Sequence, residues 1–123
     1  MKHSRLVEIA AGVVAQTQRK LPENLREAAK SVPVRFEATP DAAVLADGFE
    51  PDLLGLFSGN PLGEEGDMGD PMPPQIFLYM SNLWDFSDED VETFREEVRL
   101  TYLHELGHYL GWDEDQVAAR GLE

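Results

Sequence analysis

The spacing of apolar residues predicts two helices at the start of the chain. Residues 4–19 place apolar side chains at intervals of three and four, which gives a helix one apolar face: Leu6, Ile9, Ala10, Val13 and Val14. Residues 22–32, PENLREAAKSV, predict a second helix, because a proline suits the first helical turn and Pro33 closes the segment.

Three short segments have the apolar pattern of strands. They are residues 34–38 (VRFEA), 53–59 (LLGLFSG) and 75–80 (QIFLYM), of which the last is the clearest. Residues 39–52 contain two prolines, one glycine and four acidic residues, so they predict a short helix or a loop. Residues 60–74 are rich in glycine, proline and acidic residues and predict a loop or hairpin tip.

The last third of the chain predicts a long helix. Ser87 is a good N-cap, three acidic residues follow it, and Gly111 is placed to end the helix after Leu110. Residues 113–123 then predict one further short helix. The strands lie close together in the sequence without regular alternation with helices. We therefore expect an α+β fold in one domain, residues 1–123, with a small mixed or antiparallel sheet covered on one face by helices.

Composition narrows the choice of partner. The chain of 123 residues carries 24 acidic and 10 basic side chains, a formal net charge of −14. Nucleic acids and anionic membrane surfaces both bind clustered Lys and Arg, so neither is an expected partner. No apolar stretch is long enough to span a bilayer. The chain has no cysteine, which excludes thiolate metal sites and is consistent with the cytoplasmic location that we expect. An acidic surface also favours cationic ligands.

The stretch LTYLHELGHYLGWDEDQ, residues 100–116, carries the candidate chemistry. At about 100° per residue, His108 lies about 40° from His104 on the helix surface, so both imidazoles can reach one ion. Glu105 lies beside that face, which makes it the candidate general base. The leucines that would dock on the sheet occupy another side of the helix: Leu103, Leu106 and Leu110.

A zinc site needs at least one more ligand, and the sequence offers three carboxylates for it. Gly111 can adopt positive φ and turn the chain back after the helix. Glu114 stands three residues beyond this glycine, and Asp113 and Asp115 are the alternatives. We expect Zn²⁺ to be held by His104, His108 and one of these residues.

HELGHYLGWDE resembles the H-E-x-x-H signature of zincin metallopeptidases and most of its extended form, H-E-x-x-H-x-x-G-x-x-H/D. The resemblance implies that His104, His108 and Glu114 bind zinc, although the pattern has His or Asp where this chain has Glu114. It implies that Glu105 is the general base.

Ahead of this stretch the chain has the segments LLGLFSGNPL, residues 53–62, and PPQIFLYM, residues 73–80. With these segments the chain as a whole resembles the small bacterial zincin-like metallopeptidases, or mini-zincins. That similarity implies a minimal zincin-like fold, in which the small sheet packs against the N-terminal helices and the active-site helix. It also implies an edge strand that pairs with a peptide substrate, supplied by residues 53–59 or 75–80.

The expected function is therefore hydrolysis of peptide bonds in a peptide or protein substrate by zinc-activated water. Two alternatives remain open from the sequence. One is a metal-stabilised, catalytically inactive binding module that docks a partner without cutting it. The other is a structural domain that binds no metal.

Overall fold

The N-terminal part of the fold is helical, as its sequence pattern predicts. The structure, a computed structural model, describes residues 1–62 and 73–112. Helix α1 spans His3–Arg19 and helix α2 spans Glu23–Lys30. Both predicted helices are confirmed, the second with an earlier end than expected. The apolar face of α1 is buried, as its periodicity requires.

The strands of the described residues form one sheet, and β3, the last of them along the chain, is central. Strands β1 (Val34–Glu37), β2 (Gly55–Ser58) and β3 (Gln75–Tyr79) are arranged in the order β1-β3-β2. Strand β1 is parallel to β3, and β2 is antiparallel to it. The expectation of a small mixed sheet in an α+β fold is confirmed, and β2 is an edge strand of this sheet.

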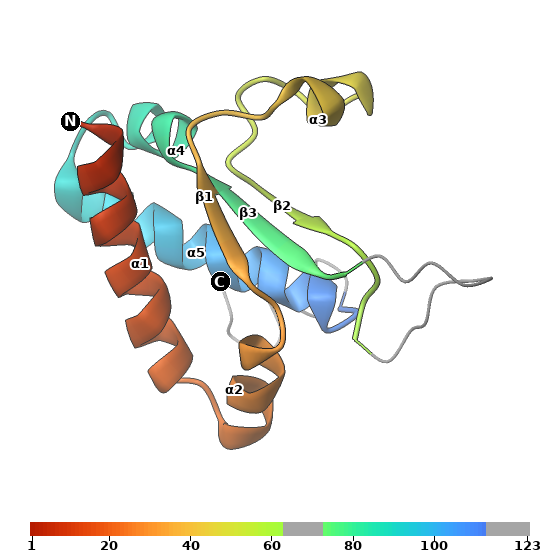
Figure 1. Cartoon of the computed structure of the whole chain (residues 1–123). Coiled ribbons are helices and arrows are strands. Elements are labelled where there is room, and N and C mark those ends of the chain that lie inside the picture. The colour runs from red at the N-terminus through yellow and green to blue at the C-terminus, as the bar shows by residue number, and fades with distance from the viewer. Residues whose placement is uncertain (63–72, 113–123) are drawn as a thin grey trace.

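Helix α5 (Val91–Tyr109) crosses one face of the sheet and contacts both β2 and β3, as well as α1 (Figure 1). Ile76 and Leu78 of β3 are fully buried in the core. Leu103 and Leu106 of α5 are buried there too, and Leu110 is half-buried against the same core. The predicted leucine face of the helix is therefore the face that packs into the core.

Two short helices connect these elements. Helix α3 (Ala42–Ala46) begins at Asp41, whose side chain accepts a hydrogen bond from the Val44 N–H at 3.0 Å. It lies in the segment for which the sequence left helix and loop open. Helix α4 (Met80–Phe86) was not predicted. It follows β3 directly, and Met80 and Leu83 are fully buried.

The prediction that Ser87 caps the long helix is wrong. Ser87 ends α4 instead, where it is buried and its Oγ donates to the Leu83 carbonyl at 2.7 Å. Asp88 and Glu89 have φ of 54° and 56°, so the chain turns there before α5 begins. The N-cap of α5 is Asp90, whose carboxylate accepts from the Thr93 N–H at 2.9 Å.

The end of α5 follows the sequence prediction closely. Gly111 has φ of +80°, its N–H donates to the His108 carbonyl, and the Trp112 N–H donates to the Gly107 carbonyl. These two bonds form a Schellman motif, which needs a residue with positive φ where the glycine stands. The predicted short helix in residues 113–123 lies outside the described residues. In the described part of the chain, no helix is both long and apolar enough to cross a membrane.

Candidate metal centre

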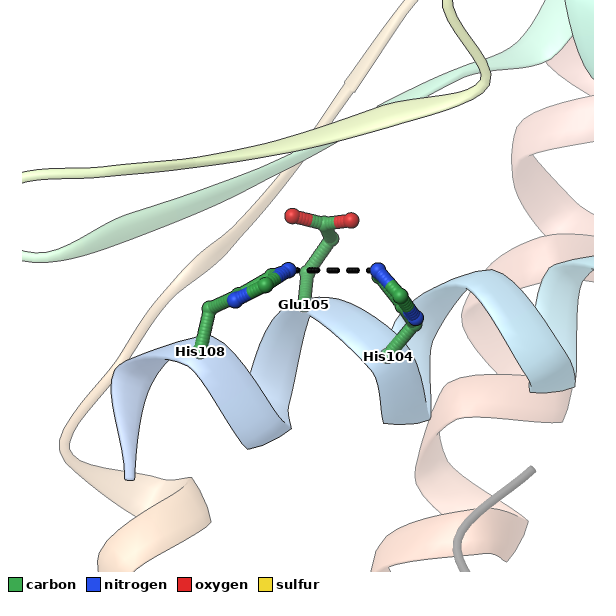
Figure 2. A group of neighbouring side chains, drawn as sticks. All are labelled: His104, Glu105 and His108. Carbon is green, nitrogen blue, oxygen red and sulfur yellow. Dashed lines mark hydrogen bonds between the residues drawn. The ribbon is translucent and has the colours of Figure 1, made fainter. Parts of the chain in front are cut away.

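The two histidines of α5 face each other across one turn of the helix (Figure 2). His104 Nε2 and His108 Nε2 are 3.1 Å apart, and the ring centroids are 4.8 Å apart. Both side chains are half-buried. The spacing of four residues places the imidazoles on one face, as the helical geometry predicts.

Glu105 lies beside this pair, and its carboxylate points toward the strands (Figure 2). Glu105 exposes 9% of its surface. Its Oε1 accepts a hydrogen bond from the backbone N–H of Phe57 at 3.0 Å. Phe57 belongs to the edge strand β2, so this bond joins the helix to the sheet edge at the centre of the site.

The register of β2 explains why the Phe57 N–H is available to the helix. The Tyr79 N–H donates to the Leu54 carbonyl at 3.0 Å, so Leu54 faces β3. Residues of an antiparallel strand alternate in the side to which their N–H and C=O point. Gly55 and Phe57 therefore turn these groups away from β3.

Gly55 permits the close approach between β2 and α5. A Cβ atom at Gly55 would lie 2.6 Å from Cγ2 of Thr101 and 3.1 Å from the Phe77 carbonyl oxygen. Any larger residue would therefore require the Thr101 side chain or the strand to shift. Gly55 thus keeps the Phe57 N–H within reach of Glu105.

The chemistry and spacing of this group fit a divalent metal ion. Candidate ligand atoms of His104, Glu105 and His108 all lie within 4.8 Å of one another. Two imidazole nitrogens bound tetrahedrally to zinc at about 2.0–2.1 Å would be about 3.3 Å apart, close to the 3.1 Å found here. Among the described residues, this is the group of His, Asp and Glu side chains that could hold an ion.

The candidates for the third ligand, Glu114, Asp113 and Asp115, lie outside the described residues. The Schellman motif at Gly111 does turn the chain at the point where the sequence requires it to leave the helix. Trp112, which follows the glycine, is half-buried against the core.

The tyrosines of α5 serve packing. Tyr102 is fully buried, its hydroxyl accepts from Gln18 Nε2 at 3.0 Å, and burial raises its pKa. Tyr109 is 3% exposed, and its hydroxyl lies 2.7 Å from Ser31 Oγ. Neither hydroxyl is directed to the histidine pair by these contacts.

Tyr79 of β3 is also buried, and the Glu105 carboxylate acts on its hydroxyl electrostatically. It is 1% exposed, and its hydroxyl has no hydrogen-bond partner in the described structure. Burial raises its pKa most, and the carboxylates of Asp41, Glu37 and Glu105 raise it further.

The sequence did not predict two features of the site: the hydrogen bond from the Phe57 N–H and the close approach at Gly55. It predicted the strand that contains both residues, but not which elements lie beside that strand. The sequence left two segments as candidates for the strand beside the cleft. In the structure β3 is the central strand and β2 is an edge strand, so β2 is the candidate that can lie beside the cleft.

A helix that presents two imidazoles and a carboxylate beside the edge strand of a mixed sheet has the arrangement of the H-E-x-x-H signature, and this group could hold a metal ion. Comparison with protein families gives the same class. The family model described as zincin-like metallopeptidase matches residues 29–122, which include all three strands and α5. The chain therefore belongs to the zincin-like metallopeptidase family. The comparison with curated proteins gave no match.

Proposed function

We propose that this chain is a zinc-dependent peptidase. In this proposal His104, His108 and Glu114 bind Zn²⁺, Glu105 is the general base, and the substrate is a peptide or protein. The observation that carries it is the distance of 3.1 Å between the two Nε2 atoms, with the Glu105 carboxylate beside them. Membership of the family supports the same reaction.

Bound zinc would supply a Lewis acid that polarises the peptide carbonyl and lowers the pKa of the attacking water. Glu105 would take a proton from that water and deliver it to the leaving nitrogen. The Phe57 N–H holds one oxygen of this carboxylate and so fixes its direction. Strand β2 would pair with the peptide backbone along its outer edge through outward-facing groups other than the Phe57 N–H, which Glu105 binds.

Metal content is the first test. We expect about one zinc per chain in the purified protein by elemental mass spectrometry. His104→Ala should abolish binding and Glu114→Ala should weaken it, because each removes a ligand. Asp113→Ala and Asp115→Ala are matched controls that should retain zinc. Loss of zinc in one of these controls, with retention in Glu114→Ala, would move the third ligand to that residue.

Glu105→Gln tests the reaction. It keeps the size of the side chain but cannot accept a proton, so peptide hydrolysis should fall by about 10²–10⁴-fold while zinc stays bound. If the wild-type protein and the Glu105→Gln variant both bind zinc and neither hydrolyses peptides, the result would favour the inactive binding module. Absence of zinc even after its addition would leave a structural domain and end the enzyme proposal.

A further inference from the structure

Two cavities open on either side of Glu105. The first, of about 490 Å³, lies on the His104 side and includes Leu100 and Thr101 in its lining. The second, of about 400 Å³, lies on the His108 side and includes Phe49 and Phe57. We call the second the Phe49 cavity. Both cavities share Gly55 and Glu105, so a peptide that runs along β2 would pass both.

Phe49 is a large apolar residue that the fold leaves 41% exposed. It lies in the connection between α3 and β2, and with Leu53, Leu56 and Phe57 it makes the Phe49 cavity predominantly apolar. An exposed aromatic side chain beside a reactive group is a typical contact for a ligand. Because Phe49 lines the same cavity as His108 and Glu105, we expect a side chain of the substrate to occupy that cavity.

The acidic residues of the chain are concentrated in the segment that supplies most of the lining of this cavity. Residues 36–94 contain fourteen Asp and Glu residues and no Lys or Arg, whereas the rest of the chain has ten acidic and ten basic residues. The connection that carries Phe49 also carries three exposed carboxylates: Asp47, Glu50 and Asp52. A basic peptide is the complementary partner for such a surface.

We propose that the substrate is an extended, Lys- or Arg-containing peptide segment that places a large apolar side chain in the Phe49 cavity, and that Phe49 is a specificity-determining residue. This proposal rests on the proposed function for the cleavage step. The binding step can be measured separately, because Glu105→Gln removes the base, keeps the size of this lining residue and leaves the apolar lining of the Phe49 cavity unchanged.

The test measures peptide binding to zinc-treated Glu105→Gln protein by fluorescence anisotropy. Three labelled peptides of equal length serve as probes: a Lys-rich peptide with a central Phe, the same peptide with a central Ala, and a Glu-rich peptide with a central Phe. We expect the first to bind about tenfold more tightly than either of the others, since a hydrophobic pocket and complementary charge each discriminate on this scale.

Phe49→Ala in the same background should abolish the preference for Phe over Ala. Leu45→Ala is the matched control, because Leu45 is also exposed, at 39%, in α3 but lines neither cavity.

The combined change Asp47→Asn, Glu50→Gln and Asp52→Asn should reduce the preference for the Lys-rich peptide and the sensitivity of its binding to salt. An unchanged Phe preference in Phe49→Ala, or an equal loss in Leu45→Ala, would overturn the proposal.

The two proposals fail in different ways. Selective binding to Glu105→Gln without hydrolysis by the wild-type protein would refute the peptidase and leave the specificity proposal standing. Hydrolysis by the wild-type protein with the same kcat/KM for all three peptides would refute the specificity proposal alone.

Discussion

At the scale of single residues, the site depends on one glycine that carries no reactive group. Gly55 lets β2 approach α5, and this approach brings the Phe57 N–H to 3.0 Å from Glu105 Oε1. The carboxylate is thereby held by the strand along which we propose the substrate to lie. The orientation of the general base and the position of the substrate strand are then set by the same contact.

Gly55→Ala should destabilise the fold by about 2 kcal/mol, because the new methyl group overlaps Cγ2 of Thr101. Thr101→Ser removes that atom, so the double variant should regain part of the loss. Urea unfolding of the four proteins measures this coupling. Gly12→Ala is the control, since no atom of the described residues lies within 4 Å of a Cβ at Gly12, and it should raise stability by about 0.5–1 kcal/mol. Equal losses in the single and double variants would contradict the overlap as the cause.

Gly111 matters for its backbone conformation. Its φ is +80°, and no atom of the described residues lies within 4 Å of the position that a Cβ would take, so the cost of a side chain that the described structure shows is conformational strain. Gly111→Ala should cost about 1 kcal/mol, and Gly111→Asn should cost less because Asn tolerates positive φ. Thermal unfolding gives both values. If the turn carries the third ligand, zinc affinity should fall in the same order.

At the scale of elements, different faces and ends of α5 have different roles. Its leucines pack into the core, its histidines and Glu105 form the candidate site, and its ends are fixed by Asp90 and Gly111. Local signals predicted the site face and the C-terminal end. They misplaced the N-terminal end, because Ser87 and Asp90 are both good caps and only the packing of α4 decides between them.

The cap at Asp90 predicts a pH dependence of stability. Hydrogen bonds from the Thr93 N–H and hydroxyl lower the pKa of Asp90 below its ordinary value of 3.8. A lowered pKa in the folded state means that the contribution is present above pH 3.8 and is lost as the pH falls through the folded-state pKa. Asp90→Ala should therefore lower Tm at neutral pH, and the gap to the wild type should close as the pH falls through the lowered pKa of Asp90. Thermal unfolding across this range measures it, and a gap that is constant with pH would contradict the charged cap.

At the scale of the whole molecule, the sheet and α5 enclose the candidate metal site from two sides. The helix supplies His104, Glu105 and His108, and the edge strand supplies the Phe57 N–H. The acidic segment between residues 36 and 94 adds the long-range field that we expect to attract a basic peptide. Because the helix and the edge strand are joined at this site, binding of the ion should stabilise the whole fold and not the helix alone.

Removal of metal should lower the thermal stability. Free zinc at about a hundred times its Kd would add about 2.7 kcal/mol to the free energy of unfolding, and EDTA should remove this increment. His104→Ala should show no difference between the two conditions. Differential scanning calorimetry makes the comparison, and an identical Tm for the wild type with zinc and with EDTA would contradict a bound ion.

Features that depend on near neighbours in the chain could be predicted without any knowledge of the fold. The apolar period of α1, the apolar pattern of β3 and the spacing of His104 and His108 all follow from the geometry of one helix or strand. Gly111 ends α5 for an equally local reason, since glycine adopts positive φ without a steric penalty.

Features that join distant residues required the assembled fold. The order β1-β3-β2 makes β2 the edge strand, and the bond between Phe57 and Glu105 spans 48 positions of the sequence. Helix α4 forms where Met80 and Leu83 pack into the core. No periodicity along the chain encodes these contacts, because they depend on which surfaces bury each other when the whole core assembles.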